Sequence, residues 1–356
     1  MAIETFRTLI SRNRRNTAML LAAFGAFFLG MGGLIGYAWG YWSGDGSEEM
    51  ARIDSLQPSG PEADPGLRQV ADAMRRDAEA RRRQAERAWA VRVAVGAAAV
   101  AFVLTLLSYY GGSSVLLSMS RAREVRKQDD PQLFNVVEEL CIAGGMPMPR
   151  IYLIDDTAMN AFATGRDPRH AAVAVTIGLR GKLNRDELQG VIGHELSHVR
   201  HHDILFATLV AVLVGTLVIL CDVFLRSVGW GAYGRSRRGR DGRGGGGAAM
   251  LILLLIGVLL AIIAPILAKI IEMAISRQRE FLADAGSVEL TRNPEGLARA
   301  LAKISEDPEV LEVANRATAP LYIIHPIKRF EDRAESIFDT HPPVRERVRR
   351  LMELAH

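Results

Sequence analysis

The hydrophobic positions of this chain are gathered in four long runs, at residues 18–42, 93–111, 204–225 and 248–271. A helix needs about 20 apolar residues to cross a bilayer, so each run is long enough to span. Trp39, Trp42, Tyr109 and Tyr110 lie at run ends, where interfacial aromatic residues gather. The pattern predicts about four transmembrane helices, although the third and fourth runs also fit helices buried in a large core.

The first run follows a basic N-terminus, residues 1–17. It is longer than the apolar core of a secretory signal, and no small-x-small cleavage site follows it before Ser43. We therefore expect an uncleaved signal anchor.

Polar segments separate the runs. Residues 43–92 form a charged linker and helix, rich in Gly, Pro and acids at first and in arginine later. Residues 226–247 form a Gly/Arg-rich loop of low complexity, for which a flexible linker is the simplest interpretation.

Two further blocks, 112–203 and 272–356, carry the alternation and capping signals of folded structure. The first predicts a helix at 131–144, strands at 150–154, 160–165 and 171–177, and a helix from 184 through 198. The second is mostly helical, with Asn293 as an N-cap and Pro294 in the first turn. The predicted fold class is α+β, mainly helical, with a small sheet.

Composition narrows the class of protein. Hydrophobic residues make up 49% of the 356 residues and charged residues 24%, which fits membrane segments joined to a water-facing domain. The net charge of +4 is too small to indicate nucleic acid as a partner. Two cysteines allow no disulfide framework and no CxxC metal site.

The candidate chemistry lies in "GVIGHELSHVRHHD", residues 190–203. His194 and His198 are four residues apart and share one helical face, so both imidazoles can bind one ion. Glu195 lies beside them and can reach a water on that ion without binding it. This is the zincin signature, and it predicts one Zn²⁺ per chain in a zincin-like metalloprotease domain.

A catalytic zinc site usually has three protein ligands, and the sequence offers a candidate for the third. Glu280 and Asp284 are again four residues apart, in "SRQREFLADAG" just after the fourth run. Glu280 suits a ligand, and Asp284 suits a partner for the second ring nitrogen of a ligating histidine. Spacing alone fits a salt-bridged helix face with Arg277 and Arg279 equally well.

The other histidines carry less weight. His201 and His202 can extend a metal site. We favour the interpretation that they are polar residues at a turn beside the membrane. His170 and His356 are expected to be inert.

At this point the chain resembles the HtpX-like membrane metalloproteases, relatives of the CAAX prenyl protease. The motifs that carry the resemblance are "GGMPMPRIYLIDDTAMNAFATG", "HELSHVRHHD", "SRQREFLADAGSVEL" and "THPPVRERVRRL". They cover roughly residues 115–205 and 270–352. The first 110 residues match only in general plan, and Met159 departs from the family, where proline often precedes the asparagine.

The resemblance implies roles for single residues. His194, His198 and Glu280 would bind zinc, Glu195 would be catalytic and Asp284 would support the site. His341 would stabilise the reacting oxyanion, with Arg347 in the same motif as possible support. The segment that would line the substrate cleft is Asn160, Ala161 and Phe162.

Together these features predict a zinc endopeptidase that cleaves membrane or misfolded proteins in quality control. Zinc lowers the pKa of a bound water towards about 7, and Glu195 takes its proton as general base. Two alternatives remain: a non-catalytic membrane scaffold or chaperone with a vestigial zinc site, and a site-2-type intramembrane metalloprotease. The polar ends of the helix that carries His194 speak against the second. The sequence carries no signal for a particular oligomeric state.

Sidedness follows partly from connectivity. If His198 and Glu280 meet at one ion, residues 203 and 272 lie on the same side, so the two runs between them cross together or not at all. Arg12, Arg14 and Arg15 favour a cytoplasmic N-terminus, but the arginines of 66–92 and 226–247 oppose that orientation. The resemblance to HtpX-like proteases favours one orientation: a bacterial inner membrane protein whose protease domain faces the cytoplasm.

Overall fold

The computed structural model describes residues 6–43, 52–53, 55, 65–213, 215–216, 277–312, 321–324 and 342–355. The chain divides into two compact units. The first unit combines residues 1–21, 105–232 and 266–356, and the second combines 22–104 and 233–265.

Two long helices pass from one unit to the other. Helix α1 covers Phe6–Ser43 and helix α3 covers Pro65–Met119. Their stretches Ser11–Tyr37 and Arg68–Met119 are long and apolar enough to cross a membrane by length and composition. The charged segment after residue 65 and the second apolar run are one continuous helix. The third and fourth runs lie almost wholly outside the described residues, as does the loop 226–247.

Within the second unit, α1 packs against α3 through glycines spaced four residues apart. A Cβ on Gly36 would lie 2.5 Å from the Trp89 carbonyl oxygen, and one on Gly32 would lie 2.6 Å from the Ala97 Cβ. A Cβ on Gly40 would lie 2.8 Å from the Cα of Glu86. Small residues at this spacing let two helix backbones approach closely, as they do in membranes.

The first unit contains a small mixed sheet. Its strands are β1 (Ala122–Glu124), β2 (Arg150–Ile154), β3 (Ala161–Gly165) and β4 (Ala171–Thr176). The order is β1-β2-β4-β3, with β2 and β4 parallel and the other pairs antiparallel. Strand β3 is therefore an edge strand. This sheet in a mainly helical chain confirms the predicted fold class.

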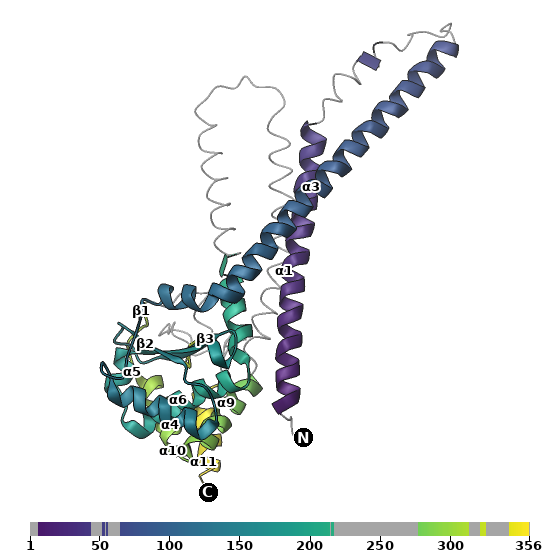
Figure 1. Ribbon diagram of the computed structural model, residues 1–356. Helices are drawn as coiled ribbons and strands as arrows, with labels where there is room; N and C mark the ends of the chain where they lie inside the picture. The colour runs from purple at the N-terminus through teal and green to yellow at the C-terminus, as the bar shows by residue number, and fades with distance from the viewer. Residues whose placement is uncertain are drawn as a thin grey trace. The chain divides into compact units, whose positions relative to one another are not determined.

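The sheet is buried on both faces. Ile151, Val173 and Ala161 face the main core with the helices, which Figure 1 shows gathered on one side of the sheet. Tyr152, Phe162 and Ala174 point the other way, into a second cluster that includes Leu117 from the end of α3 and Tyr322. Alternation along a strand produces both cores.

The helices of this unit are α4 (Pro131–Gly144), α5 (Ile177–Lys182), α6 (Arg185–Arg200), α9 (Arg277–Thr291), α10 (Pro294–Glu306) and α11 (Val344–Glu353); a short turn of 3₁₀ helix, η1 (Pro168–His170), precedes β4. Asn184 and Glu187 form a capping box that starts α6, and Asn293 caps α10 as the sequence predicts.

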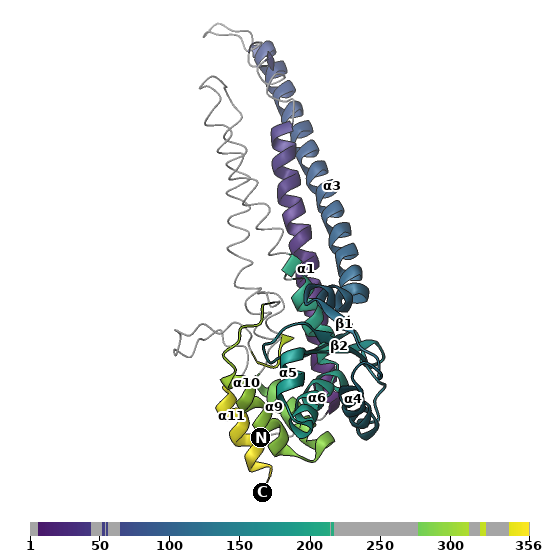
Figure 2. The same cartoon turned by 90° about the vertical axis from the view of Figure 1, so that its left-hand side faces the viewer.

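Helix α6 is the centre of this unit. It packs against α4, α9, α10 and β3, and Figure 2 shows the three helices beside it from another side. Glycines permit the close contacts: a Cβ on Gly190 would lie 2.6 Å from the Leu297 nitrogen, and one on Gly193 would lie 2.9 Å from the Ser287 hydroxyl. A Cβ on Gly286 of α9 would overlap the hydroxyl of Ser197. The histidines of α6 are thus held in a closely packed helix.

Candidate metal centre

His194 and His198 project from one face of α6, and their Nε2 atoms are 3.2 Å apart. The rings are nearly perpendicular, with centroids 4.8 Å apart. His194 is 1% exposed and His198 is partly buried. The one-turn spacing therefore aims both nitrogens at the same point, as the sequence predicts.

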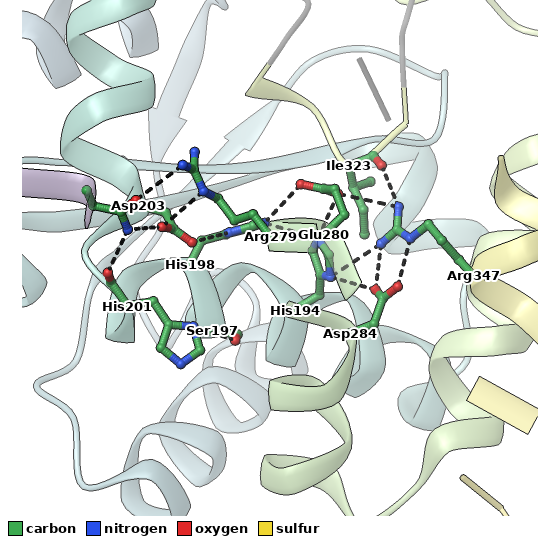
Figure 3. Close-up of polar contacts among 11 residues, drawn as sticks. His194, Ser197, His198, His201, Asp203, Arg279, Glu280, Asp284, Ile323 and Arg347 are labelled. Atoms are coloured by element: carbon green, nitrogen blue, oxygen red, sulfur yellow. Dashed lines mark hydrogen bonds and ion pairs between the residues drawn. The ribbon is translucent and has the colours of Figure 1, made fainter. Parts of the chain in front are cut away.

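Glu280 reaches that point from α9, which packs on α6 (Figure 3). Its Oε2 is 3.6 Å from His194 Nε2 and its Oε1 is 3.6 Å from His198 Nε2. Donors bonded at about 2.0–2.2 Å to a tetrahedral ion are about 3.3–3.6 Å apart. The spacing and the two-nitrogen, one-oxygen donor set both fit zinc.

The outer nitrogen of His194 is held by a buried ion pair. Asp284 Oδ1 lies 2.9 Å from His194 Nδ1. Arg347 donates to both oxygens of Asp284, at 2.9 and 2.7 Å, and its Nη1 donates to the Ile323 carbonyl at 3.1 Å. When Nδ1 donates to Asp284, the lone pair of His194 is on Nε2, toward the candidate ion.

The outer nitrogen of His198 has a similar arrangement. Asp203 Oδ2 lies 3.2 Å from His198 Nδ1, and Arg279 Nε lies 3.3 Å from Asp203 Oδ1. Each histidine is thus oriented by a carboxylate, and each carboxylate is paired with a buried arginine. Carboxylates in this position fix the ring and strengthen the ligand.

The two imidazoles differ in basicity. Burial lowers the pKa of His194 to about 4, and Arg347 adds to that effect against the pull of Asp284. Burial also disfavours the charged form of His198, but its hydrogen bond to Asp203 and the charge of Glu280 outweigh it and raise the pKa to about 9. His194 is therefore a neutral ligand at pH 7.

Glu195 is buried beside the three candidate ligands, at 2% exposure. Burial raises its pKa to about 7; the nearby His198 charge lowers the pKa and the charge of Glu280 raises it. The backbone N–H of Ala163 in strand β3 hydrogen-bonds the Glu195 carboxylate and also lowers the pKa. A carboxyl group poised near neutrality can both accept and donate a proton.

Strand β3 lies next to α6, and its residues face different ways. Asn160 Nδ2 donates to the Ile324 carbonyl at 3.0 Å, and the Ala161 carbonyl accepts from the Ile323 N–H at 3.1 Å. The ring of Phe162 packs edge-on against Tyr322, on the opposite face of the sheet from α6. The main chain of β3, rather than the Phe162 ring, is therefore what lies beside Glu195.

Of the remaining histidines, the three that the structure describes do not join the cluster. His201 caps the end of α6, and His202 has a left-handed backbone with φ of 58°, so both belong to the turn before Asp203. His170 is exposed and pairs with Asp167 at 2.8 Å. His325, His341 and His356 lie outside the described residues.

Sequence reasoning missed several side chains of this site. Asp203 ends the histidine motif, and its place five residues after His198 was the available signal. Arg279 directly precedes Glu280, but spacing alone predicts an ordinary ion-paired helix face for it. Ala163 has no local signal, because its contact with Glu195 comes from tertiary structure.

The chain is similar to known proteins over much of its length. The profile of peptidase family M48 matches residues 127–355. An HtpX protease homologue from Dictyoglomus turgidum is 44% identical over 256 residues, covering 71% of this chain and 80% of the relative. One from Thermoanaerobacter pseudethanolicus is 45% identical over 248 residues, covering 70% and 80%. Among solved structures, S. mikatae Ste24p gives a TM-score of 0.39 and 18% identity over 70% of this chain and 57% of that one, too loose a match for any conclusion.

The matches, the apolar helices and the histidine–glutamate cluster define the class: a membrane metalloprotease. More particularly, the chain belongs to peptidase family M48, and its curated relatives are HtpX proteases.

Proposed function

We propose that this chain is a zinc-dependent endopeptidase in which His194, His198 and Glu280 bind the metal. The observation that carries the proposal is the meeting of these three side chains beside the buried carboxyl of Glu195. Three ligands leave a fourth position for water, which is the arrangement of catalytic rather than structural zinc.

Zinc held here would supply a Lewis acid and lower the pKa of a bound water to about 7. Glu195 is the general base that accepts the proton of the attacking water and returns it to the leaving amine. Burial raises the pKa of Glu195 and a bound zinc ion would lower it again, so the group can both take up and release a proton. Asp284 and Asp203 keep the two imidazoles oriented.

The family resemblance supports His341 as the residue that would stabilise the oxyanion of the reaction, with Arg347 as possible support. Arg347 is fully buried and lies 3.7 Å from Glu280 Oε2. The charge of Arg347 also lowers the pKa of Glu195, and a fixed positive charge beside the site would favour negative charge developing there.

An extended substrate would lie along the edge strand β3. The Ala161 carbonyl accepts from the Ile323 N–H and the Ala163 N–H bonds Glu195, so a substrate strand at the Asn160–Phe162 segment would replace one of these bonds to pair there. Main-chain pairing at a sheet edge binds many sequences, as a quality-control enzyme requires.

We infer that the substrates are membrane or misfolded proteins. The active site would face the cytoplasm at a bacterial inner membrane. The apolar helices and the arginines before the first run and after the second support this, and the arginines of 66–92 count against it.

The test is cleavage of an unstructured protein by the full chain purified in detergent, with bound zinc counted. Glu195→Gln should retain zinc and lose cleavage by a factor of 100 or more, because general-base catalysis contributes about 10²–10⁴-fold. Glu289→Gln, an exposed glutamate on α9, is the matched control and should cleave normally. Equal cleavage by Glu195→Gln and the parent would end the assignment.

The same experiment decides between the alternatives. A scaffold with a vestigial site predicts zinc binding without cleavage in the parent. The site-2-type alternative has no support from the family match, which covers both halves of the proposed ligand set.

A further inference from the structure

Asn13 lies far from the site in sequence but reaches it in the fold. It belongs to the part of α1 that is in the same compact unit as α6 and α9. Its side chain is buried, at 4% exposure, although its neighbours Arg14 and Arg15 are exposed. A buried amide on a helix otherwise flanked by charge needs specific partners.

Both the nitrogen and the oxygen of the Asn13 side-chain amide form hydrogen bonds. Nδ2 donates to Asp203 Oδ1 and to the His201 carbonyl, the latter at 3.2 Å. Oδ1 accepts from Arg279 Nη2 at 3.2 Å. The reversed amide would place oxygen against a carboxylate and a carbonyl, so these contacts fix its orientation.

Asp203 is therefore held from two directions. Its Oδ2 faces His198 Nδ1, while Oδ1 takes Asn13 Nδ2 and Arg279 Nε together. With Oδ1 fixed by two donors, the carboxylate has one orientation in which Oδ2 meets the imidazole.

Asn13 also connects the two halves of the ligand set. His201 and Asp203 follow the ligand His198, and Arg279 directly precedes the ligand Glu280. One side chain thus contacts both segments that supply the candidate ligands (Figure 3 shows the Asp203, His198 and Arg279 part of this network).

We propose that Asn13 is a positioning residue for the metal centre, acting through Asp203 and Arg279 on His198 and Glu280. The inference rests on the proposed zinc site. It assigns the segment before the first apolar run a part in holding the metal.

The experiment measures the zinc dissociation constant of the full chain in detergent by competition with a chelator. Asn13→Leu keeps the branched shape of the side chain, at a larger volume, and removes its hydrogen bonds. Thr17→Val is the matched control, one turn along α1, because the Thr17 hydroxyl bonds only the Asn13 carbonyl of its own helix among the contacts described. The unfolding temperature of the metal-free form is measured beside each constant.

Asn13→Leu should weaken zinc binding about tenfold or more, the range for groups that orient metal ligands. Thr17→Val should leave the constant unchanged. A purely structural asparagine would lower the unfolding temperature of the metal-free protein and leave the constant within twofold of the parent, and that result overturns the proposal. If Asn13→Leu does not fold, Asn13→Ser serves instead, and an unchanged constant for that variant has the same meaning.

A double-mutant cycle tests the route. In an Asp203→Asn background, Asn13→Leu should weaken zinc binding by a smaller factor than in the parent, because the route through the Asp203 carboxylate is gone and only the one through Arg279 is left. Full additivity would contradict the route through Asp203. A parent that binds no zinc would instead defeat the proposed function, so the two failures are distinguishable.

Discussion

Arg347 is fully buried, and two carboxylates balance its charge. It makes two hydrogen bonds with Asp284 and lies 3.7 Å from Glu280. These contacts hold its guanidinium in the charged state and raise its pKa further above the usual range, against the cost of burial. The arginine and Asp284 depend on each other, because either charge alone would be uncompensated inside the protein.

Arg347→Met is therefore expected to lower the free energy of unfolding by about 3–5 kcal/mol, since it leaves Asp284 buried without its partner. Thermal or denaturant unfolding in detergent measures this. Arg349→Met, on the exposed side of the same helix, should change stability far less. Similar losses in both variants would mean that the Arg347 pair does not stabilise the fold.

Asp307 gives a prediction that depends on pH. Burial raises its pKa, but hydrogen bonds from the Met159 N–H at 2.8 Å and from Lys182 at 3.2 Å outweigh that effect, so the pKa is lowered overall. A folded-state pKa below the unfolded one stabilises the protein above the unfolded value of about 4, and this is lost as the pH falls through the folded value.

Asp307→Asn should accordingly lower the unfolding temperature at pH 7 and make less difference as the pH falls below about 4. Glu309→Gln, two residues away and exposed, is the control. A deficit for Asp307→Asn that is the same at both pH values would show that the carboxylate charge is not the cause.

What the sequence reveals of the site at this scale depends on distance along the chain. His194 and His198 were predictable because one helical turn places them together. Asn13 was not, because nothing near it in sequence indicates that its amide meets Asp203. The role of Glu280 was ambiguous until the fold placed α9 against α6, since spacing alone also fits an exposed ion-paired face.

At the scale of elements, local signals were reliable where they were strong. The capping box of Asn184 and Glu187 starts α6, and Pro131 and Pro294 stand at the beginnings of α4 and α10. Strand β1 has only three residues and no apolar alternation of its own, so it was missed; pairing with β2 creates it.

The glycines of α1 provide a test of helix packing. Gly36→Ala should lower the unfolding temperature, because the new Cβ would meet backbone atoms of Trp89 and Ala90 that cannot move aside. Gly30→Ala is matched to it: a Cβ on Gly30 has no neighbour within 4 Å among the described residues, and alanine favours the helix by about 1 kcal/mol. A stability loss in Gly30→Ala equal to that in Gly36→Ala would show that close packing is not what the glycine provides.

At the scale of the whole chain, the first unit gathers segments that apolar runs separate. Asn13 precedes the first run, Asp203 precedes the third and Arg279 follows the fourth, and all three contact one another. The chain must therefore return to the same place after residue 276. This supports the parity argument from the sequence.

The corresponding prediction concerns sidedness. Single cysteines at Arg14 and Arg345, in a chain with Cys141 and Cys221 replaced by alanine, should resist a membrane-impermeant thiol reagent in intact cells. Cysteines at Ser59 and Ser236, in the segments between runs, should react. Protection of Ser236 with reaction of Ser59 would mean that the third and fourth runs do not cross the membrane.

The ion pair between Asp203 and Arg279 also bears on how such a protein can change over time. The pair holds the two ends of the segment 204–278 next to each other, so the chain leaves the first unit and returns to it at the same point. Residues can be added or removed within this segment without altering the spacing of His198 and Glu280, because the Asp203–Arg279 pair sets that spacing. We expect relatives to differ most in length between these two anchors and least beside them.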